Sequence, residues 1–272
     1  MGVINQLDDG FGISIGGGGS AFVGLLDTYS GAAAAYSVRL LSSTYSGALV
    51  EIRRSSDNAV KDFYPDANNE LSLTSEDGSG TSLSTWIGSD DGFVRTWYDQ
   101  SGNANNAQQT TTSNQPQLIT SGALNTINGK PIIKPVNGTS EFIFTYITGL
   151  KFSFNTISVS RDFSILYGDR TSGVYEFVAL NGDGTRPDNG NVSYFKNGAA
   201  YAPSDRNTVY DDLINTQTQI TCNSTNRYGQ TGYNYNPNYG MMDCQELVIY
   251  SSDKTSDRAG IETNINDYFT IY

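Results

Sequence analysis

Short runs in which apolar and polar residues alternate recur along the second half of the chain, with turn-forming pairs between them. A period of two places successive side chains on opposite faces of a strand, and Asn-Gly pairs favour tight hairpin turns. These pairs are Asn128-Gly129, Asn137-Gly138, Asn181-Gly182 and Asn197-Gly198. Strands are predicted at residues 131–136, 142–146, 156–160, 164–167, 175–180, 192–195, 218–222 and 246–250. Many short strands with such turns indicate an all-β fold, a jelly-roll β-sandwich.

Further elements are predicted outside this region. We expect a hairpin of strands 49–54 and 59–63, a polar loop at 68–91 and a strand at 93–98. Short helices are expected over residues 32–36 and from the cap Ser256-Asp257 to about residue 267, with Ile261 and Ile265 on one face. Trp97, on an alternating strand, is expected in the core.

Asp99 follows that strand and opens a polar turn that ends at Asn103. An aspartate there could act as a catalytic acid or hold a cation. Asp, Ser and Asn in such a turn also hydrogen-bond to nearby backbone N–H groups. We therefore interpret Asp99 as a structural residue.

The first twenty residues differ from the rest. Phe11, Ile13 and Ile15 alternate with small or polar residues, and a glycine-rich linker follows at 16–20. A lone strand is not stable in water, so we expect this segment to add to a sheet of a partner protein, the alternative being a disordered tail. The predicted organisation is an anchor at 1–20 and a β-sandwich domain at 21–272.

Charge and composition exclude several classes of function. The net charge is −12 and the basic residues do not cluster, which argues against binding to nucleic acid or to anionic membranes. No apolar run approaches the roughly 20 residues of a membrane span. Residues 1–7 lack the features of a signal peptide, so synthesis in a cytoplasm is expected.

The sequence contains no histidine, which removes the commonest general base and the commonest metal ligand. The segment Asp183–Asn191 comes closest to a calcium loop, but an ordinary acidic turn is the favoured interpretation. We expect neither a metal nor a cofactor. Cys222 and Cys244 are either joined in a disulfide or buried as free thiols.

Three motifs occur in a specific order. Residues 36–49 read YSVRLLSSTYSGAL, residues 53–57 read RRSSD, and residues 98–103 read YDQSGN. This order resembles the catalytic domain of the fungal arabinofuranosidase B family, a concanavalin-A-like sandwich. It is also similar to bacteriophage virion proteins that carry a laminin-G-like jelly roll, which share the blocks at 25–33, 245–253 and 261–268.

The resemblance to the hydrolases implies a pair of carboxylates in a cleft, about 5 Å apart in a retaining enzyme. By position Glu176 is the candidate nucleophile. The family has a Gly-Gly-Asp-Asn-like segment for the acid/base, where this chain has Thr221-Cys222-Asn223-Ser224, without a carboxylate. This departure argues against hydrolysis.

A tyrosine-rich segment, residues 228–239, interleaves aromatic rings with amides. Such a segment can stack on sugar rings, contact another subunit or pack on its own domain. The candidate ligand-binding residues are Tyr228, Tyr233, Tyr235 and Tyr239.

These observations lead to the prediction of a non-enzymatic virion protein. It would be attached through residues 1–20 to capsid, portal or tail proteins, and would display in several copies a lectin-like domain that binds glycans. One alternative is a glycoside hydrolase of the arabinofuranosidase type. The other is a cement protein of the particle without a ligand.

Overall fold

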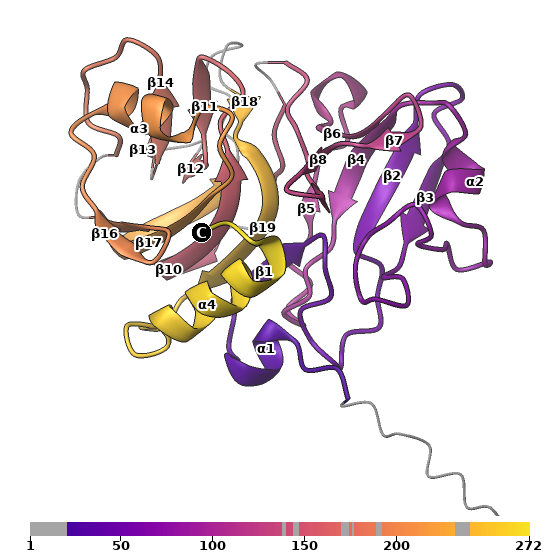
Figure 1. Ribbon diagram of the computed structural model, residues 1–272, viewed down its shortest axis with the longest axis horizontal. Coiled ribbons are helices and arrows are strands. Elements are labelled where there is room, and N and C mark those ends of the chain that lie inside the picture. The colour runs from indigo at the N-terminus through magenta and orange to yellow at the C-terminus, as the bar shows by residue number, and fades with distance from the viewer. Residues whose placement is uncertain are drawn as a thin grey trace, which may run out of the picture.

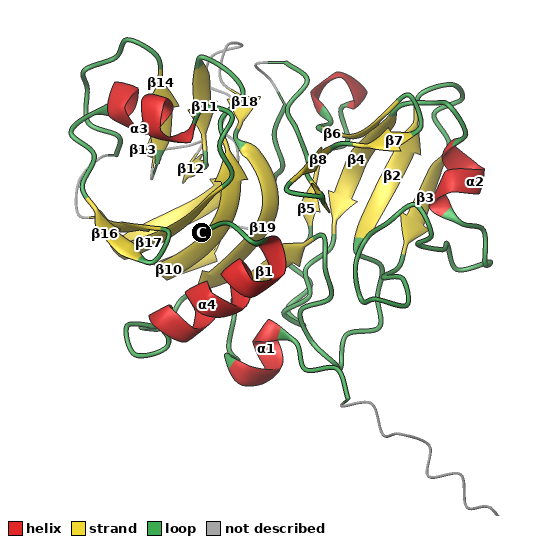
Figure 2. Cartoon of the chain, viewed as in Figure 1, coloured by secondary structure: helices red, strands yellow, loops and turns green. Residues whose placement is uncertain are grey.

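The computed structural model describes residues 21–137, 140–143, 147–169, 174–175, 177–188, 192–231 and 240–272. Two large antiparallel sheets dominate these residues, with short helices at their edges (Figures 1 and 2). The fold is an all-β sandwich, as the alternating pattern predicts. No helix among the described residues is long and apolar enough to span a bilayer.

The larger sheet has eight strands within the described residues. Its path runs β1 (Ala34–Ser37), β19 (Asp243–Tyr250), β10 (Ile147–Ser158), β17 (Thr218–Thr231), β12 (Tyr167–Asp169) and β13 (Val174–Tyr175). β15 (Val192–Lys196) pairs with β17 and with β16 (Ala199–Tyr201). The predicted strands at 156–160, 192–195, 218–222 and 246–250 overlap with β10, β15, β17 and β19.

The second large sheet has six strands within the described residues: β3 (Val60–Phe63), β2 (Val50–Arg54), β4 (Gly92–Trp97), β6 (Gln117–Thr120) and β7 (Ala123–Leu124), with β5 (Ala107–Gln108) beside β4. The predicted hairpin is β2–β3. Smaller groups are β14 (Val178–Leu180), β11 (Phe163–Ile165) and β18 (Gly240–Met241), and the pair β8 (Thr126–Ile127) and β9 (Lys130–Pro131). The Asn-Gly turns at 128–129 and 197–198 have positive φ at both residues, as a tight hairpin requires.

The helices are α1 (Leu25–Thr28), α2 (Leu83–Ile87), α3 (Arg206–Leu213) and α4 (Arg258–Phe269), with a 3₁₀ turn at Thr112–Asn114. The predicted closing helix is α4, with Ile261 and Ile265 buried. The predicted helix at 32–36 is wrong: this run includes most of β1, which pairs with β19 along its whole length. Pairing with a buried strand outweighs the helix propensity of the alanines. The predicted loop at 68–91 contains α2, whose first turn is capped by Ser82.

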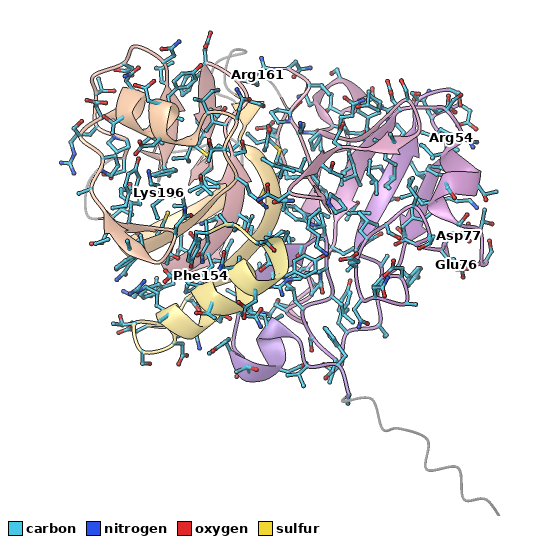
Figure 3. All side chains as sticks on the ribbon, in the orientation of Figure 1. Arg54, Glu76, Asp77, Phe154, Arg161 and Lys196 are labelled. Atoms are coloured by element: carbon cyan, nitrogen blue, oxygen red, sulfur yellow. The ribbon has the colours of Figure 1, made fainter. Side chains whose placement is uncertain are left out.

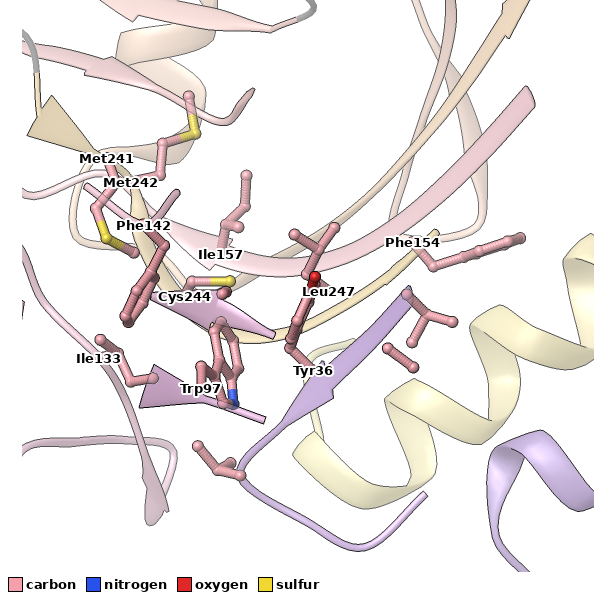
Figure 4. Close-up of a cluster of buried hydrophobic side chains, with 14 of the residues drawn as sticks. Tyr36, Trp97, Ile133, Phe142, Phe154, Ile157, Met241, Met242, Cys244 and Leu247 are labelled. Atoms are coloured by element: carbon pink, nitrogen blue, oxygen red, sulfur yellow. The ribbon is translucent and has the colours of Figure 1, made fainter. Parts of the chain in front are cut away.

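One continuous hydrophobic core joins the two large sheets. Tyr36 of β1 and Trp97 of β4 lie with their ring centroids 5.7 Å apart, and Phe142 lies 5.9 Å from Trp97 (Figure 4). All three side chains are buried, and aromatic rings of this size each remove about 150–250 Å² from water. Trp97 is therefore a core residue, as predicted, and it fixes β4 against the larger sheet.

Candidate functional site

Asp99 is part of the framework. It is 4 % exposed, and its carboxylate accepts hydrogen bonds from the backbone N–H groups of Ala35 (2.8 Å), Ser101 (2.9 Å) and Asn105 (2.9 Å). The Ser101 hydroxyl donates a further bond of 2.8 Å. With this many donors on one buried carboxylate, Asp99 ties the turn after β4 to β1 and has no surface left for a substrate.

Several sequence-predicted site residues lie outside the described residues: Glu176, Tyr233, Tyr235, Tyr239, Phe11, Ile13 and Ile15. The backbone of Tyr228 lies in β17, and its side chain is not described. The segment Thr221–Ser224 also lies in β17, where the Thr221 hydroxyl donates to Glu262 (2.7 Å). Cys222 is buried and is not joined in a disulfide.

The later half of the chain forms a cleft beside β15 and β16, with a volume of about 520 Å³. We call it the β15 cleft. Its walls are residues 186–188, 192–195 and 200–204. This volume lies within the range of about 300–1,000 Å³ that is typical of sites for small ligands.

Asp188 provides a carboxylate to the cleft. Its side chain is only 4 % exposed, the Tyr194 hydroxyl donates a hydrogen bond to it, and the Arg186 guanidinium lies 3.6 Å away. Asp188 is therefore held in place by two contacts and has limited contact with water.

Tyr194 connects the cleft to the strand that follows residue 176. Its ring packs on that of Phe177, with centroids 5.0 Å apart, and both rings are buried. Phe177 directly follows Glu176 in the sequence. Tyr194 therefore contacts both Asp188 and Phe177, the residue that follows the candidate nucleophile in the sequence.

The far wall of the cleft is more polar. Lys196 (labelled in Figure 3) forms an ion pair of 3.0 Å with Asp212 of α3 and lies 4.8 Å from the centroid of the Tyr201 ring. Burial, together with the neighbouring Asp212 carboxylate, raises the pKa of Tyr201, so its hydroxyl stays protonated and able to donate. Tyr201 stands directly opposite Tyr194 in the β15–β16 pair, so both rings lie on one face of this hairpin.

Sequence reasoning placed Asp188 in an acidic turn and did not find the cleft. The turn is real, since Asp183 accepts hydrogen bonds from the Thr185 N–H (2.9 Å) and hydroxyl (2.9 Å) and pairs with Arg206 (3.0 Å). Among the described residues, no group of three or more His, Cys, Asp or Glu side chains is arranged to hold a metal ion. The sequence feature that could have indicated the cleft is the position of Asp188 just before the predicted strand that carries Tyr194 and Phe195.

The sequence matches the family model described as α-L-arabinofuranosidase B, catalytic, over residues 27–185. A comparison with curated protein sequences gave no match. An arabinofuranosidase complexed with arabinofuranosyl-α-1,2-xylobiose shares the fold with a TM-score of 0.52 and 16 % identity. A GH54 α-L-arabinofuranosidase soaked with a cyclic sulfate inhibitor gives 0.50 and 16 %. A Glu-to-Gln mutant of a GH54 enzyme, soaked with 4-nitrophenyl α-L-arabinofuranoside, gives 0.52 and 17 %.

Each of these alignments covers 86 % of this chain and 62 % of the other chain, so the present chain spans less than two thirds of the length of these enzymes. At such low identity the structures support the fold alone. The family match covers residues of both large sheets, from α1 to β14.

The prediction of a chain without enzymatic activity is wrong, because the domain that the sequence matches is catalytic. The missing carboxylate at Thr221–Ser224 does not exclude hydrolysis, because the reaction needs two carboxylates in a cleft and another segment can supply them. The comparisons support the arabinofuranosidase alternative and give no support to a structural role in a phage particle. Attachment through residues 1–20 stays a prediction.

Proposed function

Because the chain belongs to the family of the α-L-arabinofuranosidase B catalytic domain, we propose that it binds and hydrolyses α-L-arabinofuranosides in the β15 cleft. The observation that carries the proposal is the buried Asp188 carboxylate in a cleft large enough for a sugar, in contact with Tyr194. Two of the similar structures contain arabinofuranosides, and we propose the same class of sugar as the substrate of this chain.

Hydrolysis of a glycoside requires two carboxylates, and in a retaining enzyme one of them forms a bond to the sugar. We assign the nucleophile to Glu176, which precedes Phe177, and the second carboxylate to Asp188. In the first half of the reaction the acid protonates the leaving oxygen. In the second half the carboxylate left by this proton transfer activates a water molecule, which releases the sugar from the nucleophile.

The surroundings of Asp188 also suit the transition state, in which positive charge develops at the anomeric carbon. A carboxylate shielded from water stabilises that charge more strongly than one in bulk solvent.

The test is the release of 4-nitrophenolate from 4-nitrophenyl α-L-arabinofuranoside. We expect the wild type to turn over this substrate, and Glu176→Gln and Asp188→Asn each to lower kcat by roughly 10²–10⁴-fold, the range of acid–base contributions. Asp183→Asn is the matched control, because Asp183 lies in the same loop but pairs with Arg206 and does not line the cleft. A folded wild type without turnover, or carboxamide variants as active as the control, would refute the proposal.

A further inference from the structure

Tyr194 is held rigidly by its strand and by its ring. It stands opposite Cys222 of β17 and Tyr201 of β16, so β15 is paired at both of its edges around this residue. The residue is 6 % exposed, and its ring packs at 56° on the buried ring of Phe177. A tyrosine side chain has only two torsion angles, and close packing of the ring restricts both. The Tyr194 hydroxyl therefore occupies a defined position.

This hydroxyl orients the carboxyl group of Asp188. It donates a hydrogen bond to Oδ2 of Asp188. Arg186 Nη2 lies 3.6 Å from Oδ1, which is longer than a hydrogen bond, and the Arg186 side chain is 73 % exposed. Solvent weakens exposed ion pairs, so they restrict a side chain less than a buried hydrogen bond does. Of these two contacts, the one from Tyr194 determines how the carboxyl group is oriented.

We propose that Tyr194 is a positioning residue for Asp188, the proton donor of the β15 cleft. Its hydroxyl holds Asp188, and its ring packs on Phe177, the residue that follows the candidate nucleophile Glu176 in the sequence. Proton transfer depends on such alignment, since a displacement of about 1 Å lowers a rate by up to 10²-fold. The assignment rests on the proposed function, and it adds a residue that acts on the reaction only through Asp188.

The hydrogen bond from Tyr194 also assigns the two oxygens of Asp188. A phenol hydroxyl can donate to Oδ2 whether the carboxyl group is ionised or protonated. The transferable proton is then carried by Oδ1, on the side of Arg186. This proton moves to the glycosidic oxygen as the bond from that oxygen to the anomeric carbon breaks, and its departure leaves the Asp188 carboxylate. The proton of Tyr194 stays on the phenol oxygen throughout.

Tyr194→Phe tests this role, because it removes the hydroxyl and keeps the ring that packs on Phe177. The measurement is kcat/KM for two substrates, arabinofuranosyl-α-1,2-xylobiose and 4-nitrophenyl α-L-arabinofuranoside. The xylobiose leaving group needs a proton as it departs, whereas 4-nitrophenolate leaves without one. We expect kcat/KM to fall by about ten-fold or more for the trisaccharide and by less than about three-fold for the aryl substrate.

Tyr98→Phe is the matched control. The Tyr98 hydroxyl also donates to an aspartate, Asp62 of β3, at 2.7 Å, but this pair lies in the other large sheet. The control should leave kcat/KM for both substrates within about two-fold of the wild type. In the Asp188→Asn background, Tyr194→Phe should change kcat/KM for the trisaccharide by less than about two-fold, because no proton donor is left to position. Thermal unfolding checks that each variant is folded.

The outcomes separate this role from the proposed function. The role of Tyr194 is overturned if Tyr194→Phe lowers kcat/KM equally for both substrates, as a general loss of structure does, or leaves the trisaccharide unaffected. A further loss in the Asp188→Asn background also overturns it. The proposed function stands in all these cases as long as Asp188→Asn is impaired. A wild type without turnover, or an Asp188→Asn variant as active as the wild type, refutes the proposed function and this role together.

Discussion

Arg39 and Glu246 form a buried two-bond ion pair that joins the segment after β1 to the centre of β19. Arg39 Nε lies 2.8 Å and Nη2 3.0 Å from the two carboxylate oxygens of Glu246, and the side chains are 10 % and 0 % exposed. The Ser37 hydroxyl also donates to Glu246 (2.7 Å), and the guanidinium lies 4.7 Å from the centroid of the Tyr268 ring in α4. This pair holds β1, β19 and the closing helix in one arrangement.

Arg39→Met should lower the free energy of unfolding by about 3–5 kcal/mol, because it leaves the Glu246 charge buried without a partner. The double variant Arg39→Met/Glu246→Leu should recover most of this loss, since apolar replacements remove both charges together. Urea denaturation of both variants measures the difference. A double variant that is less stable than the single one would contradict this account.

Asp99→Asn should destabilise the fold by about 1–3 kcal/mol, because the amide NH₂ replaces an oxygen that accepts from Ser101 and Asn105. Asp90→Asn is a suitable control, since the Asp90 carboxylate is partly exposed and contacts Arg54 at 3.9 Å. Thermal unfolding compares the two. Equal stability of both variants would show that the turn after β4 does not depend on the carboxylate.

Asp243 should make stability depend on pH in the mildly acidic range. Burial raises the pKa of this carboxyl from 3.8 to about 6, although the Ser160 hydroxyl donates to it at 2.6 Å. A raised pKa in the folded state means that the protonated form favours folding. Its contribution is fully present below pH 3.8 and is lost as the pH rises through 6.

Asp243→Asn should therefore gain up to about 3 kcal/mol relative to the wild type between pH 4 and pH 7, at about 1.4 kcal/mol for each unit of pKa shift. Comparing the two proteins at each pH cancels the contributions of the other carboxylates. The measurement is the unfolding free energy in urea at several pH values. A difference that stays constant over this range would show that Asp243 keeps an ordinary pKa.

Cys222 and Cys244 should remain thiols even under oxidising conditions. Both are buried outside any disulfide, and they pair with Ser153 and Ile157 of β10, on its two sides. Four residues of strand alone span about 13 Å, beyond the roughly 7 Å that a disulfide allows between Cα atoms.

Burial also raises the pKa of the Cys244 thiol, so little thiolate is available to react. We expect no reaction of Cys244 with iodoacetamide in the native protein and full labelling of both cysteines after unfolding in guanidinium. Mass spectrometry of the labelled peptides gives the result. Recovery of a Cys222–Cys244 cross-link would contradict the strand register.

The sequence alone determined the elements whose signal is local. The Asn-Gly turns at 128–129 and 197–198 and the Ile261–Ile265 face of α4 each act within a few residues and appear in the structure, as do the strands predicted at 156–160, 192–195, 218–222 and 246–250. The strand predicted at 131–136 does not form, since this run holds the end of β9 and isolated bridges. The turn at Asp99 was equally readable, because its side chain bonds to backbone only two and six residues away as well as to β1.

Tertiary structure determined those elements whose hydrogen-bond partners lie far away in the sequence. The alanine run at 32–36 became β1 because β19, more than 200 residues later, supplies its hydrogen bonds. The β15 cleft is lined by residues 186–204, which are close in sequence, but the pairing of β15 with β17 holds its wall in place. The energy of pairing between distant segments does not follow from local periodicity. The sequence therefore predicted the fold class but not the position of the cleft.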